Sequence, residues 1–266
     1  IKSRWDCKSG YRDMLVLALP LILSTSAMSV QEFVDRMFLT WYSPETIAAA
    51  TPAGILSFAL MSIFIGTAGY VSTFIAQYFG AKQYDRIGLV LWQGVYISVI
   101  AGLGFLLLIP WTPAIFRIIG HDPVIQRYEV IYFRVLCYGA VPMIASATLS
   151  GFFSGLGNTW PVMWVNVLAT AVNVTLDYAM IFGKWGFAER GIQGAAIATD
   201  IAMCVNCGLY MLLQSRRAFD EQYPTRRGWR LDMILLRRIW KFGFPNGAQF
   251  FLDMIGITVF ILFMGR

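Results

Sequence analysis

Six long apolar stretches dominate this chain and leave it few folds to adopt. A helix needs about 20 predominantly apolar residues to cross the hydrocarbon core of a bilayer. Each stretch reaches that length, so each predicts a membrane-spanning helix. A seventh apolar segment starts at Phe242 and continues to the last residues of the sequence, which ends at Arg266. The six predicted spans cover Met14–Leu39, Thr51–Phe79, Ile87–Ile109, Val130–Gly155, Val162–Phe182 and Gly191–Leu213.

The overall composition supports an all-α, multi-pass membrane protein. Of the 266 residues, 58% are hydrophobic and 14% are charged, whereas a soluble domain carries about 25% charged residues. The mean hydropathy is +0.61. The net charge of +6 does not indicate nucleic-acid binding, because the basic residues lie between the apolar spans instead of on one amphipathic face.

The distribution of basic residues predicts an orientation. Fourteen of the 21 Lys and Arg residues lie in the N-terminal tail, in the loop after the second span and in the connector from Gln214 to Lys241. Cytoplasmic loops are enriched in Lys and Arg, so we expect the N-terminus and the connector in the cytoplasm and the protein in the cytoplasmic membrane. The connector is expected to include a surface helix from Leu231 to Trp240.

The fifth span carries a polar stripe. Asn166, Thr170, Asn173 and Asp177 fall within about 60° of one another at 100° per residue. A carboxylate inside an apolar span costs roughly 2.5–3.5 kcal/mol on the insertion scale, so Asp177 should face protein or a wet cavity. Two interpretations remain open: a polar seam that holds neighbouring helices together, and a site for a cation or a proton.

The first span offers a second acid on a polar face. Asp35 shares its face with Ser24 and Gln31, while Glu32 can simply pair with Arg36 at the next turn. Two carboxylates that face each other in a low-dielectric interior cannot both stay ionised cheaply. We therefore expect a proton or a small cation between Asp35 and Asp177, and the sequence does not decide which.

Pro20 and Pro245 mark a weak internal repeat. Pro20 should kink the first span and serve as a hinge, because a proline ring removes one backbone hydrogen bond. An offset of 225 residues places Pro245 on Pro20, and six spans, a basic connector and a restart are a common transporter plan. We expect residues 1–240 to form a six-helix lobe with its connector, and residues 241–266 to begin a second lobe.

Two other function classes compete with transport. An intramembrane enzyme needs a nucleophile and a base, or a set of metal ligands, on helices that face each other. The only histidine is His121, and Cys204 and Cys207 form the one pair of cysteines with CxxC spacing. We interpret both cysteines as packing residues. A membrane subunit that anchors partners without transporting anything would tolerate neutralisation of its intramembrane acids. No cofactor is expected other than a bound sodium ion.

Several motifs resemble the multidrug and toxic compound extrusion (MATE) transporters, in the right order over almost the whole chain. They are Leu19-Pro20, Val34-Asp35-Arg36, Ile47-Ala-Ala-Ala50, Gly66-Thr67, Ala76-Gln-Tyr-Phe-Gly80-Ala81, Gly151-Phe-Phe-Ser-Gly-Leu-Gly157-Asn158-Thr159, Asn173-Val-Thr-Leu-Asp177-Tyr and Gly191-Ile-Gln-Gly194-Ala-Ala-Ile-Ala198-Thr199. The lipid-linked oligosaccharide flippases of the same superfamily share this architecture and remain an alternative.

The resemblance implies a twelve-helix exporter of two six-helix lobes, of which this chain is the N-terminal half, truncated within helix seven. Such exporters exchange amphipathic, mostly cationic compounds for protons or sodium. The resemblance places a cation site at Asp35, Asn173, Asp177 and Thr199, and a further sodium-linked acid at Asp253. Additional candidates are Gln31, Asn166 and Asp200, an extra acid that departs from the family pattern, as does Thr40.

Overall fold

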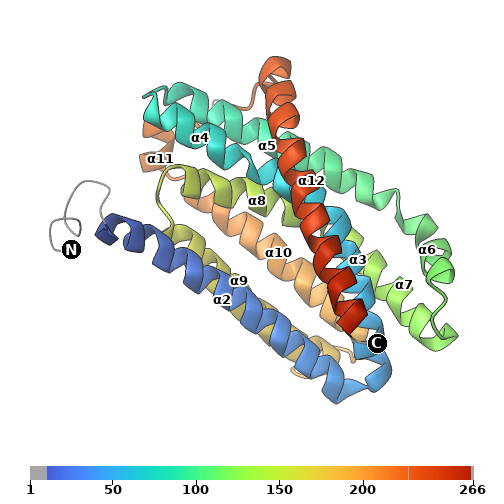
Figure 1. Cartoon of the computed structure of the whole chain (residues 1–266). Coiled ribbons are helices and arrows are strands. Elements are labelled where there is room, and N and C mark those ends of the chain that lie inside the picture. Colours follow the sequence, from blue (N-terminus) through green and yellow to red (C-terminus); the bar gives the residue numbers. More distant parts are fainter. Residues whose placement is uncertain (1–10, 227, 265–266) are drawn as a thin grey trace.

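The computed structural model describes residues 11–226 and 228–264, which form helices joined by turns (Figure 1). Residues 1–10, with most of the predicted basic tail, Arg227 and residues 265–266 lie outside the described residues. The helices are α2 (Tyr11–Tyr42), α3 (Pro44–Gly69), α4 (Val71–Gly80), α5 (Asp85–Leu106), the 3-10 turn η1 (Ile109–Trp111), α6 (Thr112–Ile119), α7 (Pro123–Tyr138), α8 (Ala140–Gly155), α9 (Trp160–Ile181), α10 (Ile192–Gln214), α11 (Arg217–Gln222) and α12 (Met233–Met264).

Five of the six predicted spans are confirmed by helix length and composition, and the fourth qualifies when two bent helices are taken together as one span. Five apolar helical segments are long enough to cross a membrane, namely Met14–Tyr42, Pro44–Gly80, Asp85–Ile119, Trp160–Ile181 and Ile192–Gln214. The sixth is the pair α7 and α8, which meets at an angle of 48°. The chain is therefore an all-α, multi-pass membrane protein with the beginning of a seventh long helix.

The fourth span differs from its predicted form because it starts earlier and is broken. It begins at Pro123, not near Val130, with Asp122 accepting a hydrogen bond from the Val124 N–H at 2.9 Å. The break falls at Gly139, between α7 and α8. Pro142 explains it, since a proline cannot donate to the carbonyl four residues earlier, which is that of Tyr138.

Helix seven also begins earlier than predicted. Asp232 caps α12 by accepting hydrogen bonds from the N–H groups of Ile234 and Leu235, both at 3.0 Å. The expected surface helix from Leu231 to Trp240 is therefore the first part of α12, and the segment boundary predicted after residue 240 falls inside this helix. No helix breaker separates the two parts, and Pro245 lies within α12 as Pro20 lies within α2.

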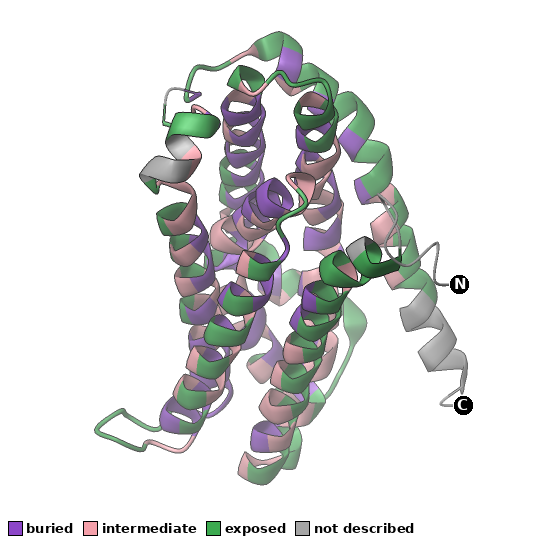
Figure 2. Ribbon diagram, turned by 90° about the vertical axis from the view of Figure 1, so that its left-hand side faces the viewer, coloured by how far each residue is buried: buried purple, intermediate pink, exposed green. Residues whose placement is uncertain are grey.

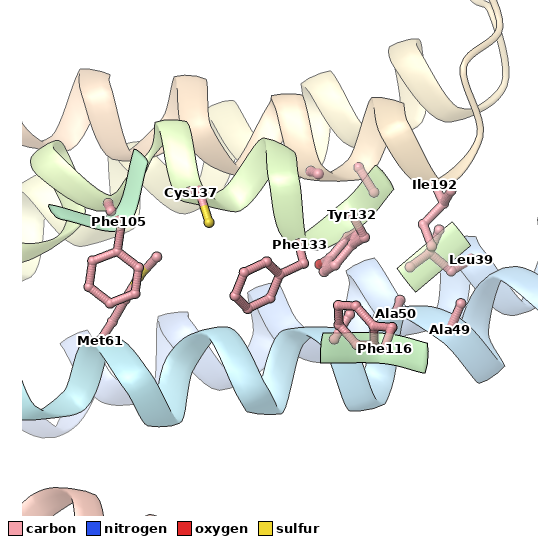
Figure 3. Packing of buried hydrophobic residues seen from close by; sticks show 14 of the residues in the cluster. Leu39, Ala49, Ala50, Met61, Phe105, Phe116, Tyr132, Phe133, Cys137 and Ile192 are labelled. Carbon is pink, nitrogen blue, oxygen red and sulfur yellow. The ribbon is translucent and has the colours of Figure 1, made fainter. Parts of the chain in front are cut away.

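The helices pack around two apolar clusters. One cluster joins α3, α6 and α7 through residues such as Phe116, Tyr132 and Phe133, seen from close by in Figure 3. The other joins α4, α5 and α8 with parts of α9, α10 and α12. Helix α9 packs against α2 on one side and α10 on the other, and α12 packs mainly against α3 (Figure 1).

Close backbone contact holds α12 on α3. A side chain on Gly66 would meet the Cα of Gly247 at 2.7 Å, and the Asn246 amide donates to the Gly66 carbonyl at 2.9 Å. Figure 2 shows exposed residues along the outer faces of the helices, and many of the exposed side chains are large and apolar. Such faces are expected where lipid, and not water, surrounds a protein.

Candidate functional site

The polar stripe of α9 faces protein, as the cost of burying its side chains in lipid requires. Its first residue, Asn166, donates to the Ser24 hydroxyl of α2 at 2.5 Å. The Asn206 amide of α10 donates to the Asn166 carbonyl oxygen at 2.8 Å. Three helices are therefore joined by one chain of hydrogen bonds, and for Asn166 the polar-seam interpretation is sufficient.

The next polar side chain of the stripe is also paired. The Thr170 hydroxyl lies 3.3 Å from the Gln31 carbonyl oxygen and 3.5 Å from the backbone oxygen of Ala27, both on α2. Hydrogen bonds between membrane helices contribute about 0.6 kcal/mol each on average. This half of the stripe ties α2, α9 and α10 together.

The second half of the stripe is different because its oxygens lack donors. Asn173 and Asp177 are fully buried. The Asn173 amide nitrogen reaches the Thr199 hydroxyl of α10 at 3.5 Å, and that hydroxyl donates to the Ala195 carbonyl at 3.1 Å. The Asn173 carbonyl oxygen and both carboxylate oxygens of Asp177 have no hydrogen-bond partner.

Asp35 of α2 completes the arrangement. It is half-buried, and one of its carboxylate oxygens is enclosed without a partner. Its charge acts on Asp177 across the α2–α9 contact, while Arg36 and Glu32 on the same helix act on Asp35 itself. Asn173, Asp177 and Thr199 thus lie together between α9 and α10, and Asp35 of α2 lies within electrostatic range of Asp177.

Four enclosed acceptor oxygens without donors can be stabilised in two ways. Each buried acceptor left unpaired costs about 1–3 kcal/mol, and a bare carboxylate costs more. A proton shared by the acids would supply a donor. A small hard cation would do the same, because carboxylate and carbonyl oxygens suit such ions. The residues therefore fit a sodium ion or a proton. A separate kind of metal site, built from three or more His, Cys, Asp or Glu side chains, is not found within the described part of the chain.

Tyr132 of α7 is a neighbour of this site that sequence reasoning missed. Its buried ring lies against the α3 backbone near Gly54, and it is within electrostatic range of Asp35, Asp177 and Asp200. A single tyrosine in an apolar helix carries no sequence signal of its own. The α7–α10 and α3–α7 contacts, which no local pattern shows, bring it there.

His121 and Glu129, at the start of α7, form a second pair that the sequence did not predict. The His121 Nδ1 lies 2.6 Å from the Glu129 carboxylate, and Glu129 is fully buried. The pair connects the loop before α7 to the body of that helix. It belongs to the fold of α7 and lies outside the stripe.

The remaining candidates lie elsewhere. Asp200 of α10 lies against Gly139 at the break between α7 and α8, where a side chain on Gly139 would overlap its carboxylate, and it lines a separate pocket of about 640 Å³ with Cys204. Cys204 is exposed, in contrast to the predicted packing role, whereas Cys207 is buried. Asp253 is exposed on α12, which packs mainly against α3.

A large cavity of about 1160 Å³ lies between α3, α5 and α12, and none of its lining residues belongs to the polar stripe. The stripe and this cavity are therefore separate features, and the cavity needs its own explanation.

Comparisons with known proteins agree on one family. The sequence model of the MatE family matches residues 20–179. A probable multidrug resistance protein NorM of Synechocystis sp. is 29% identical over 99% of this chain and 62% of its own length. Another, from Thermotoga maritima, is 26% identical over 94% of this chain and 53% of its own.

Solved structures show the same fold. An outward-facing multidrug resistance MATE family transporter of the MOP superfamily superimposes with a TM-score of 0.81 at 21% identity, over 94% of this chain and 54% of its own. A MATE structure in complex with MaD3S gives a TM-score of 0.82 at 21% identity, over 94% and 55%. The chain spans about half the length of the proteins it matches.

Proposed function

The chain belongs to the MatE family, whose members are transporters and not enzymes, and we propose that it forms one lobe of a secondary multidrug exporter. The exporter would exchange organic cations for protons or sodium across the cytoplasmic membrane. Because the chain spans about half of its relatives, we propose that a second, C-terminal six-helix lobe completes the substrate cavity.

The unpartnered oxygens of Asp35, Asn173 and Asp177 carry this proposal. A purely structural stripe would pair its members throughout, as Asn166 and Thr170 are paired. Instead, the pairing stops where two acids from different helices approach each other. A coupling ion has to bind and leave, so its site must retain unsatisfied oxygens in the absence of that ion.

The mechanism we propose is competition between the coupling ion and the substrate. A proton or sodium ion at Asp35 and Asp177 would favour one arrangement of α2 against α9, and the substrate would favour the other. A ligand shifts such an equilibrium only by its differential affinity for the two arrangements. Pro20, inside α2, leaves one carbonyl of that helix without its usual donor, and we propose it as the hinge.

The proposed substrate class follows from charge. Arg36 and Arg134 are the only Lys or Arg side chains well inside the six spans of the described chain, so these spans present more negative than positive charge to a buried ligand. Amphipathic cations suit such a surface. The orientation with a cytoplasmic N-terminus rests on the distribution of Lys and Arg.

The test is efflux from vesicles with an imposed proton or sodium gradient, comparing the wild type with Asp177→Asn and Asn166→Ala. Asp177→Asn should insert and fold but lose gradient-driven efflux of a cationic dye. Asn166→Ala, in the paired half of the same stripe, should lose stability but keep its coupling per folded molecule. Efflux at the wild-type rate from Asp177→Asn would refute the proposal and favour a non-transporting anchor subunit.

A further inference from the structure

The cavity between α3, α5 and α12 combines an apolar wall with a basic edge. Its wall is formed by α5 between Ile97 and Phe105, by Leu108 in the turn after α5, and by α3 between Leu60 and Phe64. The first turns of α12 provide its edge, where Arg237, Arg238 and Lys241 line the cavity beside Trp240. Its volume of about 1160 Å³ exceeds the range of about 300–1,000 Å³ for most small-molecule sites.

The three basic side chains are available to a ligand. All three are exposed, and no Asp or Glu among the described residues forms a salt bridge with them. The Arg238 guanidinium lies over the Phe74 ring at 5.8 Å, and the Lys241 ammonium over the Phe242 ring at 5.9 Å. These contacts place two of the three charges over aromatic rings, and none of the three side chains has a hydrogen-bond acceptor among the described residues.

The position of the edge fits a membrane interface. Gln93 of α5 donates to the Arg230 carbonyl at 2.9 Å and accepts from the Asp232 N–H at 3.3 Å, so the start of α12 crosses α5 just before the apolar wall begins. From Ile97 to Phe105 that wall extends about 12 Å at 1.5 Å per residue, and Leu108 lengthens it in the turn beyond α5. This is close to half of a hydrocarbon core of about 30 Å, the depth of one leaflet.

We propose that this cavity binds an anionic phospholipid of the cytoplasmic leaflet. Its phosphate would lie at Arg237, Arg238 and Lys241, and its acyl chains along the α3–α5 wall. The choice of leaflet rests on the orientation proposed above. Three positive charges exclude the organic cations proposed as substrates, and the apolar wall would be left empty by a free anion.

Such a lipid would also affect α12. Because the headgroup contacts come from α12 and the acyl contacts from α3 and α5, the lipid connects the first helix of the second lobe to the first lobe. The association of the two elements would then depend on the anionic lipid content of the membrane.

Native mass spectrometry of the complete, delipidated protein measures this binding directly, with phosphatidylglycerol, phosphatidylcholine and inorganic phosphate as probes. The wild type should bind phosphatidylglycerol at least about tenfold more tightly than phosphatidylcholine, given the attraction of each basic residue to anionic lipid. The triple variant Arg237→Gln, Arg238→Gln, Lys241→Gln should lose that preference. The matched control Lys82→Gln, Arg86→Gln, Arg230→Gln removes the same charge from the same side, outside the cavity, and should retain the preference.

A second pair of variants tests the apolar wall. A side chain on Gly104, which lines the cavity, meets nothing within 4 Å, so Gly104→Phe should fold and fill the acyl site. It should weaken binding of phosphatidylglycerol, whereas Gly208→Phe, equally unobstructed on α10, should not. Equal loss in both triple variants, binding that Gly104→Phe leaves unchanged, or competition by inorganic phosphate alone would each overturn the proposal. None of these outcomes depends on transport activity.

Discussion

Asn166 and Asp177 share one face of α9, yet their surroundings differ in kind. Asn166 has a donor partner on α10 and an acceptor on α2, whereas both oxygens of Asp177 are buried without a donor. The helical spacing predicted that Asn166, Thr170, Asn173 and Asp177 share one face of the helix, and the structure confirms this. Periodicity could not show which of them would be paired, because pairing depends on side chains of α2 and α10.

At this scale we predict that Asn206→Ala destabilises the protein without affecting the acids. The substitution removes the donor to the Asn166 carbonyl oxygen and leaves that oxygen buried, at a cost of about 0.6–1.7 kcal/mol for a membrane interhelical hydrogen bond. Unfolding in mixed detergent micelles measures the change. Thr175→Ala is the control, because the Thr175 hydroxyl bonds only within its own helix and is exposed. Equal losses of stability in the two variants would contradict the interpretation that the Asn206–Asn166 hydrogen bond holds the helices together.

Among the elements, the broken fourth span shows what a sequence pattern leaves out. The apolar run around Gly139 predicts one continuous helix, and Pro142 alone does not fix the angle at which α7 meets α8. Gly139 also contacts Asp200 of α10, and a contact between two helices distant in sequence has no local sequence signal. A mid-span acid outside the family pattern thus packs against Gly139 of another span, a contact that the sequence of α10 alone could not reveal.

We predict that Gly139→Ala is destabilising by about 1–3 kcal/mol, because its Cβ would overlap the Asp200 carboxylate and packed interiors do not absorb extra atoms freely. In a double-mutant cycle, Asp200→Ala should remove most of the overlap, so that the double variant loses less stability than the sum of the two single variants. Thermal unfolding in detergent is the measurement. Gly69→Ala, whose new Cβ would meet nothing within 4 Å, is the control, and additive losses would contradict the contact.

Over the whole molecule, the sequence predicted the fold class and, with the bent pair α7 and α8 taken as one span, the number of spans. Long apolar runs and the absence of water in the bilayer allow few other solutions. The predicted start of helix seven was too late in the sequence. The Asp232 cap lies in the basic connector, whose composition is typical of a segment at the membrane surface. The position of Tyr132 beside the acids also required the packing of α7 against α3 and α10. The roles assigned to Asp253 and to the hinge at Pro20 stay predictions.

The central claim is that the oxygens of Asp35, Asn173 and Asp177 hold the ion that a substrate displaces. The most direct measurement is the release of protons and sodium ions, counted together, when tetraphenylphosphonium binds to the purified complete protein in weakly buffered detergent. We predict that about one cation per bound substrate leaves the wild type and Asn166→Ala, and that almost none leaves Asp177→Asn. Undiminished release from Asp177→Asn would contradict it.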